Sequence, residues 1–599
     1  MKFLTSTYFK ALSFEAYLSF GLSFVILLYA FSPFRMGANL VFQNQTGIIF
    51  VITALSWTGC ICIIIKQICC HGFLKHVTSL DLLLFVYLIY LLLQLLFYTV
   101  DREYALRIAC LVSLYYLFRN IPAKLTVALL YLLPVLAAIQ IVYGYNRLTY
   151  PWQGLSDITG GFTNTGIFGG FVAMGCVAAF GLLLSTKRPY IKIAMAILLI
   201  PLALQLFCSQ SRAGYVAAIT GIFILLFSVF RKKIAAQQIN TKKLFTRLII
   251  LFVTVFLLIA AVWLSVKLYH YKKDSADGRL LIWTVSCSML KEKPLTGFGP
   301  QGFQKNYPIR QGLYLKNHPE SNRSYLANDI SSPFNELLKT GIEQGIVGLF
   351  FVFGMFYMVF DSRTNPPVLR ATLAAIFAFS CFSYPFDFFV FQLLVVFCLS
   401  GIASSQKTEN IKYYPLKNIA LKTTVICLIT VIYGTVLISS LNYYKNVKNW
   451  NRTTYYFPRK DNQKIDELKA LYPAFKYNAQ FLHTYGSSLY EAQYYNEAIA
   501  VLEEAKELFS SSETLLLLGE AYEKTGANEK ALEVWETASH IKPSLFMPHY
   551  NMAKLYYKTG DYELAKQKAG EVLNKKIKIN LPKINRIKKE MQEIYLCDY

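Results

Sequence analysis

The chain of 599 residues is 55% hydrophobic, whereas only 16% of its residues are charged. In soluble domains about a quarter of the residues are charged, so the composition excludes one large soluble enzyme. Many apolar runs reach about 18 residues or more, which is long enough to cross the hydrocarbon layer of a bilayer as a helix. We therefore expect an all-α, polytopic membrane protein.

The net charge of +25 is concentrated in the first three quarters of the chain. Residues 450–599 hold 21 Lys and Arg and 20 Asp and Glu, out of 60 and 35 in the whole sequence. The excess of cations therefore lies in the membrane part, where cytoplasmic loops normally collect Lys and Arg. A nearly neutral soluble part excludes nucleic acid as a partner. The 12 cysteines include no Cys-x-x-Cys pair, so no disulfide framework or metal site is predicted.

The first apolar stretch begins near residue 15. No small-residue cleavage site follows it, so we predict a retained span rather than a removed signal peptide. Similar stretches recur along the chain and give a bundle of about 12–13 spans. These are residues 15–32, 47–65, 80–99, 104–118, 124–143, 166–185, 191–208, 213–230, 247–266, 345–360, 367–383, 385–402 and 420–440.

The cations between these spans predict the orientation of the protein. With the N-terminus in the cytoplasm, 21 Lys and Arg fall in inside segments. The short outside loops then hold four cations, which are Arg35, Arg102, Arg147 and Arg212. This asymmetry predicts that the long segment 267–344 and everything after residue 440 lie outside the cytoplasm.

The segment 267–344 is far longer than a connection between two spans requires. Helical patterning around Trp283 predicts that it is ordered. Within it, residues 291–306 read KEKPLTGFGPQGFQKN, a Gly-rich sequence typical of tight turns. Loops of this length that keep order usually carry function.

A helical repeat is predicted in the C-terminal part. Residues 512–543 place Gly519, Tyr522, Ala531 and Trp535 at the spacing of a 34-residue tetratricopeptide repeat, with one unit before and one after. Small residues at these positions allow two antiparallel helices to approach closely. We therefore expect residues 1–441 to form the membrane domain, residues 442–478 to link it, and residues 479–599 to form the repeat domain.

Several short motifs surround the long segment, each near a predicted membrane end. They are Ser211-Arg212-Ala213-Gly214, Gly278-Arg279 with Trp283, Pro294-x-x-Gly297-x-Gly299, Phe334-Asn335-Glu336 and Glu343-x-Gly345-x-x-Gly348. Residues 160–166, GGFTNTG, open an earlier span and also suit a helix cap. Together the motifs resemble the O-antigen ligase family and its relatives, the O-antigen polymerases and protein O-oligosaccharyltransferases.

The resemblance implies transfer of a glycan from a polyprenyl (undecaprenyl) diphosphate carrier to an acceptor, on the outer face of the bacterial inner membrane. It implies an inverting reaction without a metal or another cofactor. Arg212 and Arg279 would hold the diphosphate, as planar guanidinium groups suit phosphate oxygens. The matching positions also include Trp283, Gly297, Gly299, Asn335, Glu343 and Gly345.

One position departs from the family, where a loop histidine usually activates the acceptor hydroxyl. This chain has Phe334 there, which cannot accept a proton. A replacement base must reach the acceptor at hydrogen-bond distance. We rank Glu336 first, because desolvation beside the apolar span would raise its pKa, and His318 second, with Asp329 a further carboxylate. The alternatives are that Glu336 only caps a helix, or that departure of the diphosphate needs no strong base.

The acceptor stays open between a protein, lipid A core and a growing glycan chain. A solenoid offers a concave surface for a protein partner, which favours a protein acceptor. A different class of function, a polysaccharide transporter or membrane scaffold, would place charges at the middle of the spans. Here the charges collect at the membrane ends. We therefore favour an enzyme over a transporter or scaffold, with membrane lipids among its partners.

Overall fold

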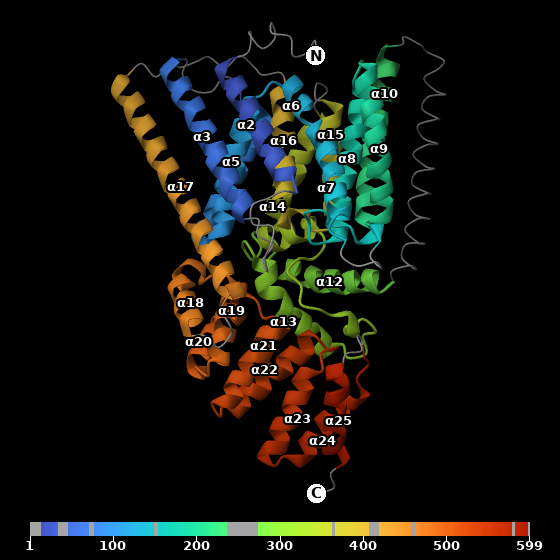
Figure 1. Ribbon diagram of the computed structural model, residues 1–599, viewed down its shortest axis with the longest axis vertical. Helices are drawn as coiled ribbons and strands as arrows, with labels where there is room; N and C mark the ends of the chain where they lie inside the picture. The colour runs from blue at the N-terminus through green and yellow to red at the C-terminus, as the bar shows by residue number, and fades with distance from the viewer. Residues whose placement is uncertain are drawn as a thin grey trace.

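The computed structural model describes residues 13–33, 46–70, 77–148, 154–236, 273–361, 366–406, 418–456, 462–577 and 582–596. All regular elements among these residues are helices, which agrees with the all-α prediction. They form a membrane bundle, a layer of helices below it, and a helical repeat domain beyond that layer (Figure 1).

The membrane bundle contains the long apolar helices of the chain. Its helices are α2 (Phe14–Phe31), α3 (Thr46–Cys70), α4 (Ser79–Phe97), α5 (Arg102–Arg119), α6 (Ala123–Leu129), α7 (Leu132–Tyr145), α8 (Thr165–Ser185), α9 (Pro189–Cys208), α10 (Arg212–Ala236), α14 (Glu336–Asp361), α15 (Pro367–Ser380), α16 (Phe389–Ser405) and α17 (Ile419–Tyr456). In the described part of the chain, short 3-10 turns accompany the helices at η2 (Leu155–Asp157), η3 (Ser324–Leu326) and η4 (Pro385–Asp387).

The predicted spans agree with these helices. Nine helical segments in the described part of the chain are long and apolar enough to cross a membrane, and one of them joins α6 to α7. Helices α15 and α16 are apolar but shorter, and α5 carries charges at both ends. The predicted span 247–266 lies outside the described residues.

Most residues of helix α8 are buried inside the bundle. Its glycines allow close packing, because a Cβ on Gly170 would lie 2.2 Å from the ring of Phe379 on α15, and one on Gly169 would meet Ser209 and Ser211 at about the same separation. In a bilayer, helices associate through such close contacts of small residues rather than through the hydrophobic effect. Asn164 caps α8 by accepting from the N–H groups of Gly166 and Ile167, at 2.7 and 3.3 Å.

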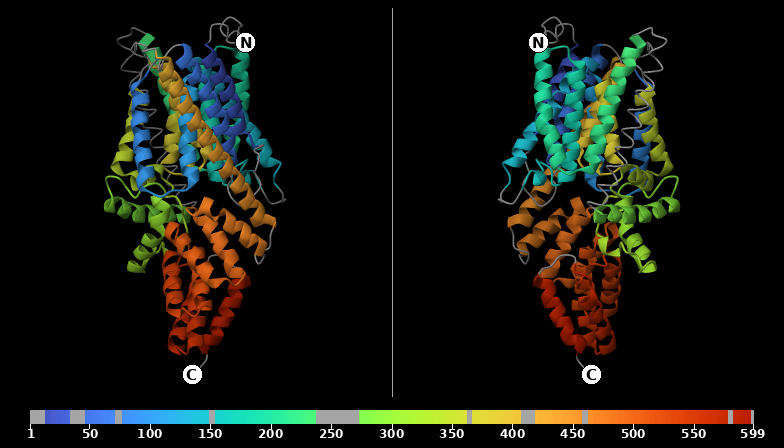
Figure 2. Two further views of the ribbon diagram at one scale, coloured as in Figure 1. Left: turned by 90° about the vertical axis from the view of Figure 1, so that its left-hand side faces the viewer. Right: turned by 90° about the vertical axis from the view of Figure 1, so that its right-hand side faces the viewer.

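Two helices of the long segment form the layer below the bundle. Helix α12 (Lys273–Glu292) runs across the ends of the membrane helices, and α13 (Gly302–Asn317) continues from it toward the repeat domain (Figures 1 and 2). Both lie at the end of the bundle where α2 finishes. The long segment and the repeats therefore share one end of the bundle.

Of residues 442–478, expected to link the two domains, the described ones lie mostly in packed helices. Helix α17 runs without interruption from the bundle into the repeat domain (Figure 2). Its buried Trp450 packs 5.2 Å from the ring of Phe475 on α18 (Asn462–Phe475) and 5.3 Å from Phe481 on α19. The last turns of α17 and α18 therefore extend the core of the solenoid.

The repeat domain consists of paired antiparallel helices. They are α19 (Ala479–Glu491), α20 (Tyr495–Leu508), α21 (Ser512–Lys524), α22 (Asn528–Ile541), α23 (Met547–Thr559), α24 (Tyr562–Asn574) and α25 (Pro582–Leu596). Gly519 has the role expected from the repeat pattern, since a Cβ there would lie 2.3 Å from the indole nitrogen of the buried Trp535. Helix α25 packs on α24 and closes the array, with Ile587 and Met591 buried.

Candidate active site between the bundle and the loop helices

The two candidate arginines face each other from α10 and α12. Arg212 is the first residue of α10, and its Nη2 donates to Ser275 Oγ on α12 at 3.1 Å. The preceding Ser211 donates to the carbonyl of Gly166 at 2.9 Å, which ties the start of α10 to the start of α8. The sequence motif Ser-Arg-Ala-Gly therefore fixes where the guanidinium of Arg212 leaves the bundle.

Arg279 lies one helix away on α12. Its Nη1 donates to the carbonyl of Phe382 at 3.0 Å, and its guanidinium carbon lies 5.3 Å from the ring centre of Phe334. Burial and the nearby charge of Arg212 lower the pKa of Arg279 to about 10. Two cations repel each other in this partly buried position. A bound anion would offset the repulsion, so the pair is a candidate anion site.

Phe334 occupies a strained backbone position between these elements. Its φ is 55°, and its ring meets Tyr384 edge to face at a centroid distance of 5.0 Å. The indole nitrogen of Trp283 on α12 donates to the carbonyl of Pro333 at 2.9 Å. The next residue, Asn335, caps α14 by accepting from the N–H of Leu338 at 3.0 Å. Trp283 and Asn335 thus fix the segment that carries Phe334.

Acidic groups and a lysine gather at the first turns of α14. Glu336 is only 5% exposed and accepts from the N–H of Phe386 at 2.9 Å. Lys339, one turn later, forms an ion pair with Asp387 at 2.6 Å. Glu343 is 9% exposed on the following turn. Buried ionisable groups are costly at a membrane end unless they are paired or serve a function.

The Gly-rich motif and the glycine motif of α14 are packing partners. Helix α14 breaks at Gly345, where φ is 65° and ψ is −161°. Across the break, the N–H of Gly299 donates to the carbonyl of Glu343 at 2.9 Å, and the N–H of Ile346 donates to that of Pro294 at 2.8 Å. A Cβ on Gly297 would lie 2.5 Å from the carbonyl oxygen of Ile342. The two motifs therefore join the loop to α14 through backbone contacts, which only glycine permits.

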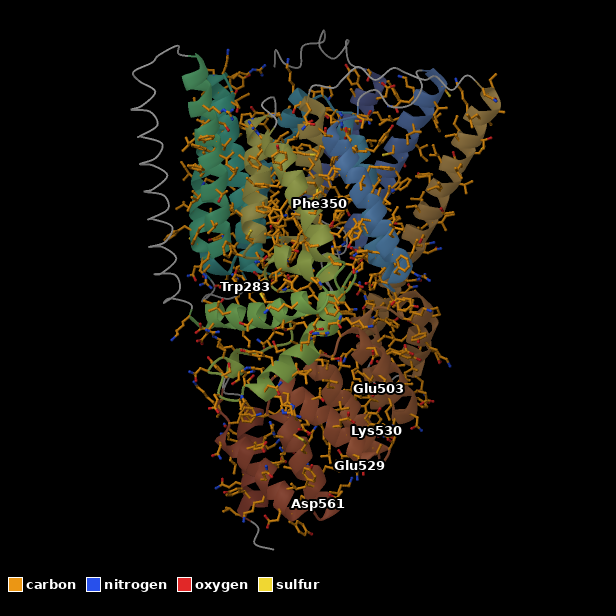
Figure 3. All side chains as sticks on the ribbon, turned by 180° about the vertical axis from the view of Figure 1, so that it is seen from behind. Trp283, Phe350, Glu503, Glu529, Lys530 and Asp561 are labelled. Carbon is orange, nitrogen blue, oxygen red and sulfur yellow. The ribbon has the colours of Figure 1, made fainter. Side chains whose placement is uncertain are left out.

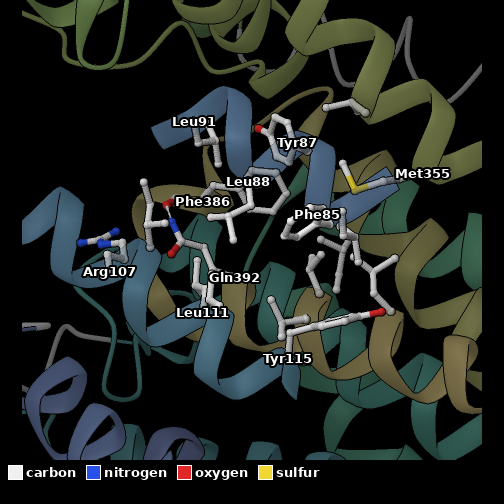
Figure 4. Close-up of a pocket in the computed structure, with 18 of the residues that line it drawn as sticks. Phe85, Tyr87, Leu88, Leu91, Arg107, Leu111, Tyr115, Met355, Phe386 and Gln392 are labelled. Carbon is white, nitrogen blue, oxygen red and sulfur yellow. Dashed lines mark hydrogen bonds between the residues drawn. The ribbon is translucent and has the colours of Figure 1, made fainter. Parts of the chain in front are cut away.

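A cavity of about 1390 Å³ opens between α4, α5, α14 and α16. Its middle is apolar, with Phe85, Leu88, Leu111 and Met355 among the lining residues (Figure 4), and Glu15, Asp81 and Arg119 line its far end. Its end near the loop helices is polar. The polar side chains there include Asp101, Glu103, Arg107, Gln301, Gln304, Ser331, Glu336, Lys339, Thr340, Glu343, Asp387, Gln392 and Asn478.

The structure brings Glu336 and Glu343 to this cavity, whereas neither candidate arginine is among the described residues that line it. The segments around Phe334 and Tyr384 lie between, with Arg279 contacting one side and Glu336 the other. His318 is elsewhere, at the end of α13, where its exposed ring stacks on Tyr314 at 4.4 Å. The two base candidates therefore occupy different surroundings.

Sequence reasoning missed Lys339 and Asp387 as parts of this cluster. A signal was present in the sequence, because Lys339 follows Glu336 by three residues on one helix face, and Asp387 is a charged residue near the start of the predicted span 385–402. Their pairing across the chain could not be read from the sequence. Asp329, weighed as a further carboxylate, contacts the repeat domain instead, through the N–H of Ser512 at 2.7 Å.

Comparison with known protein families agrees with this architecture. Residues 194–353, which include both arginines and both glycine motifs, match the O-antigen ligase domain. Residues 519–560 match the tetratricopeptide repeat. No curated protein matches the chain. The chain is therefore a polytopic membrane protein that carries an O-antigen ligase domain and C-terminal tetratricopeptide repeats.

Proposed function

We propose that this protein transfers a glycan from a polyprenyl diphosphate carrier to the hydroxyl group of a lipid-anchored acceptor, at the periplasmic face of the bacterial inner membrane. The O-antigen ligase domain supports the reaction class, since it implies a lipid-linked glycan as substrate. The observation that carries the proposal is the separation of a cationic site from an acid-lined, lipid-sized cavity.

The diphosphate of the donor is assigned to Arg212 and Arg279. These guanidinium groups lie close enough for one to lower the pKa of the other. A diphosphate would offset this repulsion and accept charge-assisted hydrogen bonds from both. The leaving diphosphate gains negative charge as the glycosidic bond breaks, so fixed cations stabilise the transition state more than the ground state.

The acceptor is assigned to the cavity. Carboxylates outnumber cations at its polar end, where Asp101, Glu103 and Asp387 contribute, so this end disfavours a diphosphate. Carboxylate and amide groups suit the hydroxyl groups of a neutral sugar, and the apolar part suits an acyl or prenyl chain. An amphiphile with a hydroxylated head group fits both halves, which describes lipid A core and a carrier-linked growing chain alike.

Glu336 is placed at the wall between the two assigned sites and is our candidate for the base. In the proposed step, the acceptor oxygen forms a bond to the anomeric carbon while the bond from that carbon to the diphosphate oxygen breaks. The proton of the acceptor hydroxyl passes to the carboxylate of Glu336, and the polyprenyl diphosphate leaves from the arginine pair. Lys339, which forms an ion pair with Asp387 at 2.6 Å, is a cation on the same helix one turn after Glu336.

A protein acceptor is the second candidate, because the repeats lie at the same end of the bundle as the arginines and such repeats commonly bind proteins. Deleting the gene and comparing lipopolysaccharide ladders with glycoprotein staining separates the two. Loss of long ladders with unchanged glycoproteins supports a lipid-anchored acceptor. Loss of glycoprotein staining with intact ladders replaces it with a protein acceptor, and no change in either removes the proposed transfer.

The proposed orientation has its own test. The asymmetry of loop cations predicts a cytoplasmic N-terminus, and the loop helices share one end of the bundle with the repeats. Reporter fusions after Lys305 and after Gly526 are therefore expected to give periplasmic signals, whereas a fusion after Arg231 gives a cytoplasmic one. A cytoplasmic signal at Gly526 would contradict the assignment of the repeats to the periplasm.

The base assignment predicts unequal effects of two substitutions. Glu336→Gln keeps an oxygen that accepts from the N–H of Phe386 but removes the proton acceptor, so turnover is expected to fall about 100-fold or more. His318→Ala removes an exposed ring stacked on Tyr314, and turnover is expected to change less than about twofold. The reverse order in a transfer assay would assign the base to His318. Wild-type turnover in both variants would favour catalysis by leaving-group stabilisation alone.

A further inference from the structure

The ends of two helices in the repeat domain form hydrogen bonds with the long segment 267–344. Asp329 accepts from the backbone N–H of Ser512 at 2.7 Å and also from the Ser512 hydroxyl, at the first residue of α21. The first N–H groups of a helix lack partners within the helix and carry partial positive charge, so a carboxylate there satisfies a donor and matches the dipole. Lys542 lies 3.6 Å from the same carboxylate.

A second contact joins α13 both to the repeat domain and to Asn328, the residue before Asp329. Gln311 of α13 is 1% exposed, and its amide nitrogen donates to the carbonyl of Ile541 at 2.7 Å and to that of Asn328 at 3.2 Å. Ile541 ends α22, where carbonyl groups lack helical partners. Gly312 permits this approach, because a Cβ there would already lie 3.1 Å from the Ile541 side chain.

These contacts fix the beginning of a short segment whose end carries the candidate site. We name residues 328–336 the site segment. Its first residues, Asn328 and Asp329, are bonded to the repeat contacts just described, and Pro333 accepts from Trp283 on the arginine-bearing helix. Three residues separate the two attachments, so the path of the chain between them has little freedom.

A third contact holds the repeats to the bundle independently of the site segment. Asp101, 7% exposed at the start of α5, accepts from Asn478 Nδ2 at 2.7 Å and from the hydroxyl of Tyr443 at 3.2 Å. Asn478 itself caps α19, by accepting from the N–H of Phe481 at 3.0 Å. The repeat domain is thus held to the bundle as well as to the loop, and can act as a fixed support.

We infer that the repeat domain positions the site segment through Asp329, so that it is a structural part of the active site in addition to any partner it binds. This inference rests on the proposed function for its activity readout only. Asp329 is a positioning residue, because it acts on Phe334, Asn335 and Glu336 through the backbone that it anchors. The repeat pattern explains why the anchor exists, since it places the start of α21 against the loop.

The test uses the full-length protein in detergent and two readouts. In Asp329→Ala, hydrogen–deuterium exchange of the site segment is expected to rise, and turnover in glycan transfer to fall about tenfold or more, because small misplacements of reacting groups are costly. The KM for the carrier-linked donor is expected to stay within about twofold, since the arginines are untouched. Asp329→Asn keeps an oxygen acceptor without the charge, and an intermediate effect in both readouts is expected.

The matched control is Glu529→Gln, which removes a carboxylate from the first turn of α22 on the exposed surface of the same domain (Figure 3). In Glu529→Gln, exchange of the site segment and turnover are expected to equal those of the wild type. Ser512→Ala removes the hydroxyl donor but keeps the N–H donor and the helix, so it tests the same contact if the Asp329 variants misfold. A small rise in exchange of the site segment is expected in this variant.

Unchanged exchange of the site segment in both Asp329→Ala and Ser512→Ala would overturn the anchor. Increased exchange with wild-type turnover would show that the anchor does not serve the site, and would overturn the positioning role. A rise in exchange in a protein whose wild type transfers no glycan would leave the anchor standing and contradict the proposed function instead.

Discussion

Arg279→Ala is expected to reduce glycan transfer by about 100-fold or more while the protein still accumulates in the membrane. The side chain contacts Phe382 and Phe334 through one hydrogen bond and one ring face, so its loss removes little packing. It would remove a cation from the assigned diphosphate site, where the charge of the leaving group develops. A transfer assay with a polyprenyl diphosphate-linked glycan measures the effect on kcat and KM separately.

Two further variants sharpen this result. Arg279→Lys keeps the charge but lacks the planar fork of donors, so partial recovery is expected. Arg147→Ala is the matched control, because Arg147 is an exposed arginine whose guanidinium donates to the Tyr143 hydroxyl at 3.3 Å. Its transfer rate is expected to equal that of the wild type. Wild-type kcat/KM in Arg279→Ala would remove the diphosphate assignment.

Gly345→Ala is expected to cost about 3 kcal/mol or more of stability and to abolish transfer. The backbone of Gly345 lies in a region that is open almost only to glycine, with φ at 65° and ψ at −161°. A Cβ would also lie 2.1 Å from the carbonyl oxygen of Leu295. The clash is with backbone, which cannot rotate away, so the loop and α14 must separate.

The thermal unfolding midpoint of the purified protein, with Gly434→Ala as control, measures this cost. Gly434 lies within the membrane helix α17, and a Cβ there meets nothing within 4 Å. Replacing a helical glycine with alanine in open space is expected to leave the midpoint unchanged or to raise it slightly. If Gly345→Ala unfolded at the wild-type temperature and kept its transfer rate, the break in α14 would have no structural role.

The membrane helices could be predicted because their signal is local. A run of apolar residues such as α4 must be helical in lipid, since no water is present to satisfy its backbone. The repeats are equally local, because Gly519 and Ala531 mark positions where two neighbouring helices touch. For the loop helices α12 and α13, the sequence predicted order and helical patterning around Trp283. It did not predict their directions, since these depend on what the helices pack against.

The site was predictable in part. The resemblance to the O-antigen ligase family made Arg212 and Arg279 candidates, and planar guanidinium groups suit a diphosphate. This chain has Phe334 where the family usually has a histidine, so the sequence left Glu336, His318 and Asp329 as open alternatives for the base. The structure separates the three, with Glu336 at the cavity, His318 stacked on Tyr314, and Asp329 on the repeats.

The sequence by itself determined the helical class, the repeat domain and the residue types available for the site. Apolar periodicity, small-residue spacing and charge are properties of neighbouring residues, and these decide local structure. Tertiary structure alone decided that the Gly-rich loop and Gly345 are partners, that Lys339 pairs with Asp387, and that Asp329 accepts a hydrogen bond from the repeat domain. Each of these contacts joins residues brought together only by the packing of distant helices, and no local pattern encodes which helix end a side chain will meet.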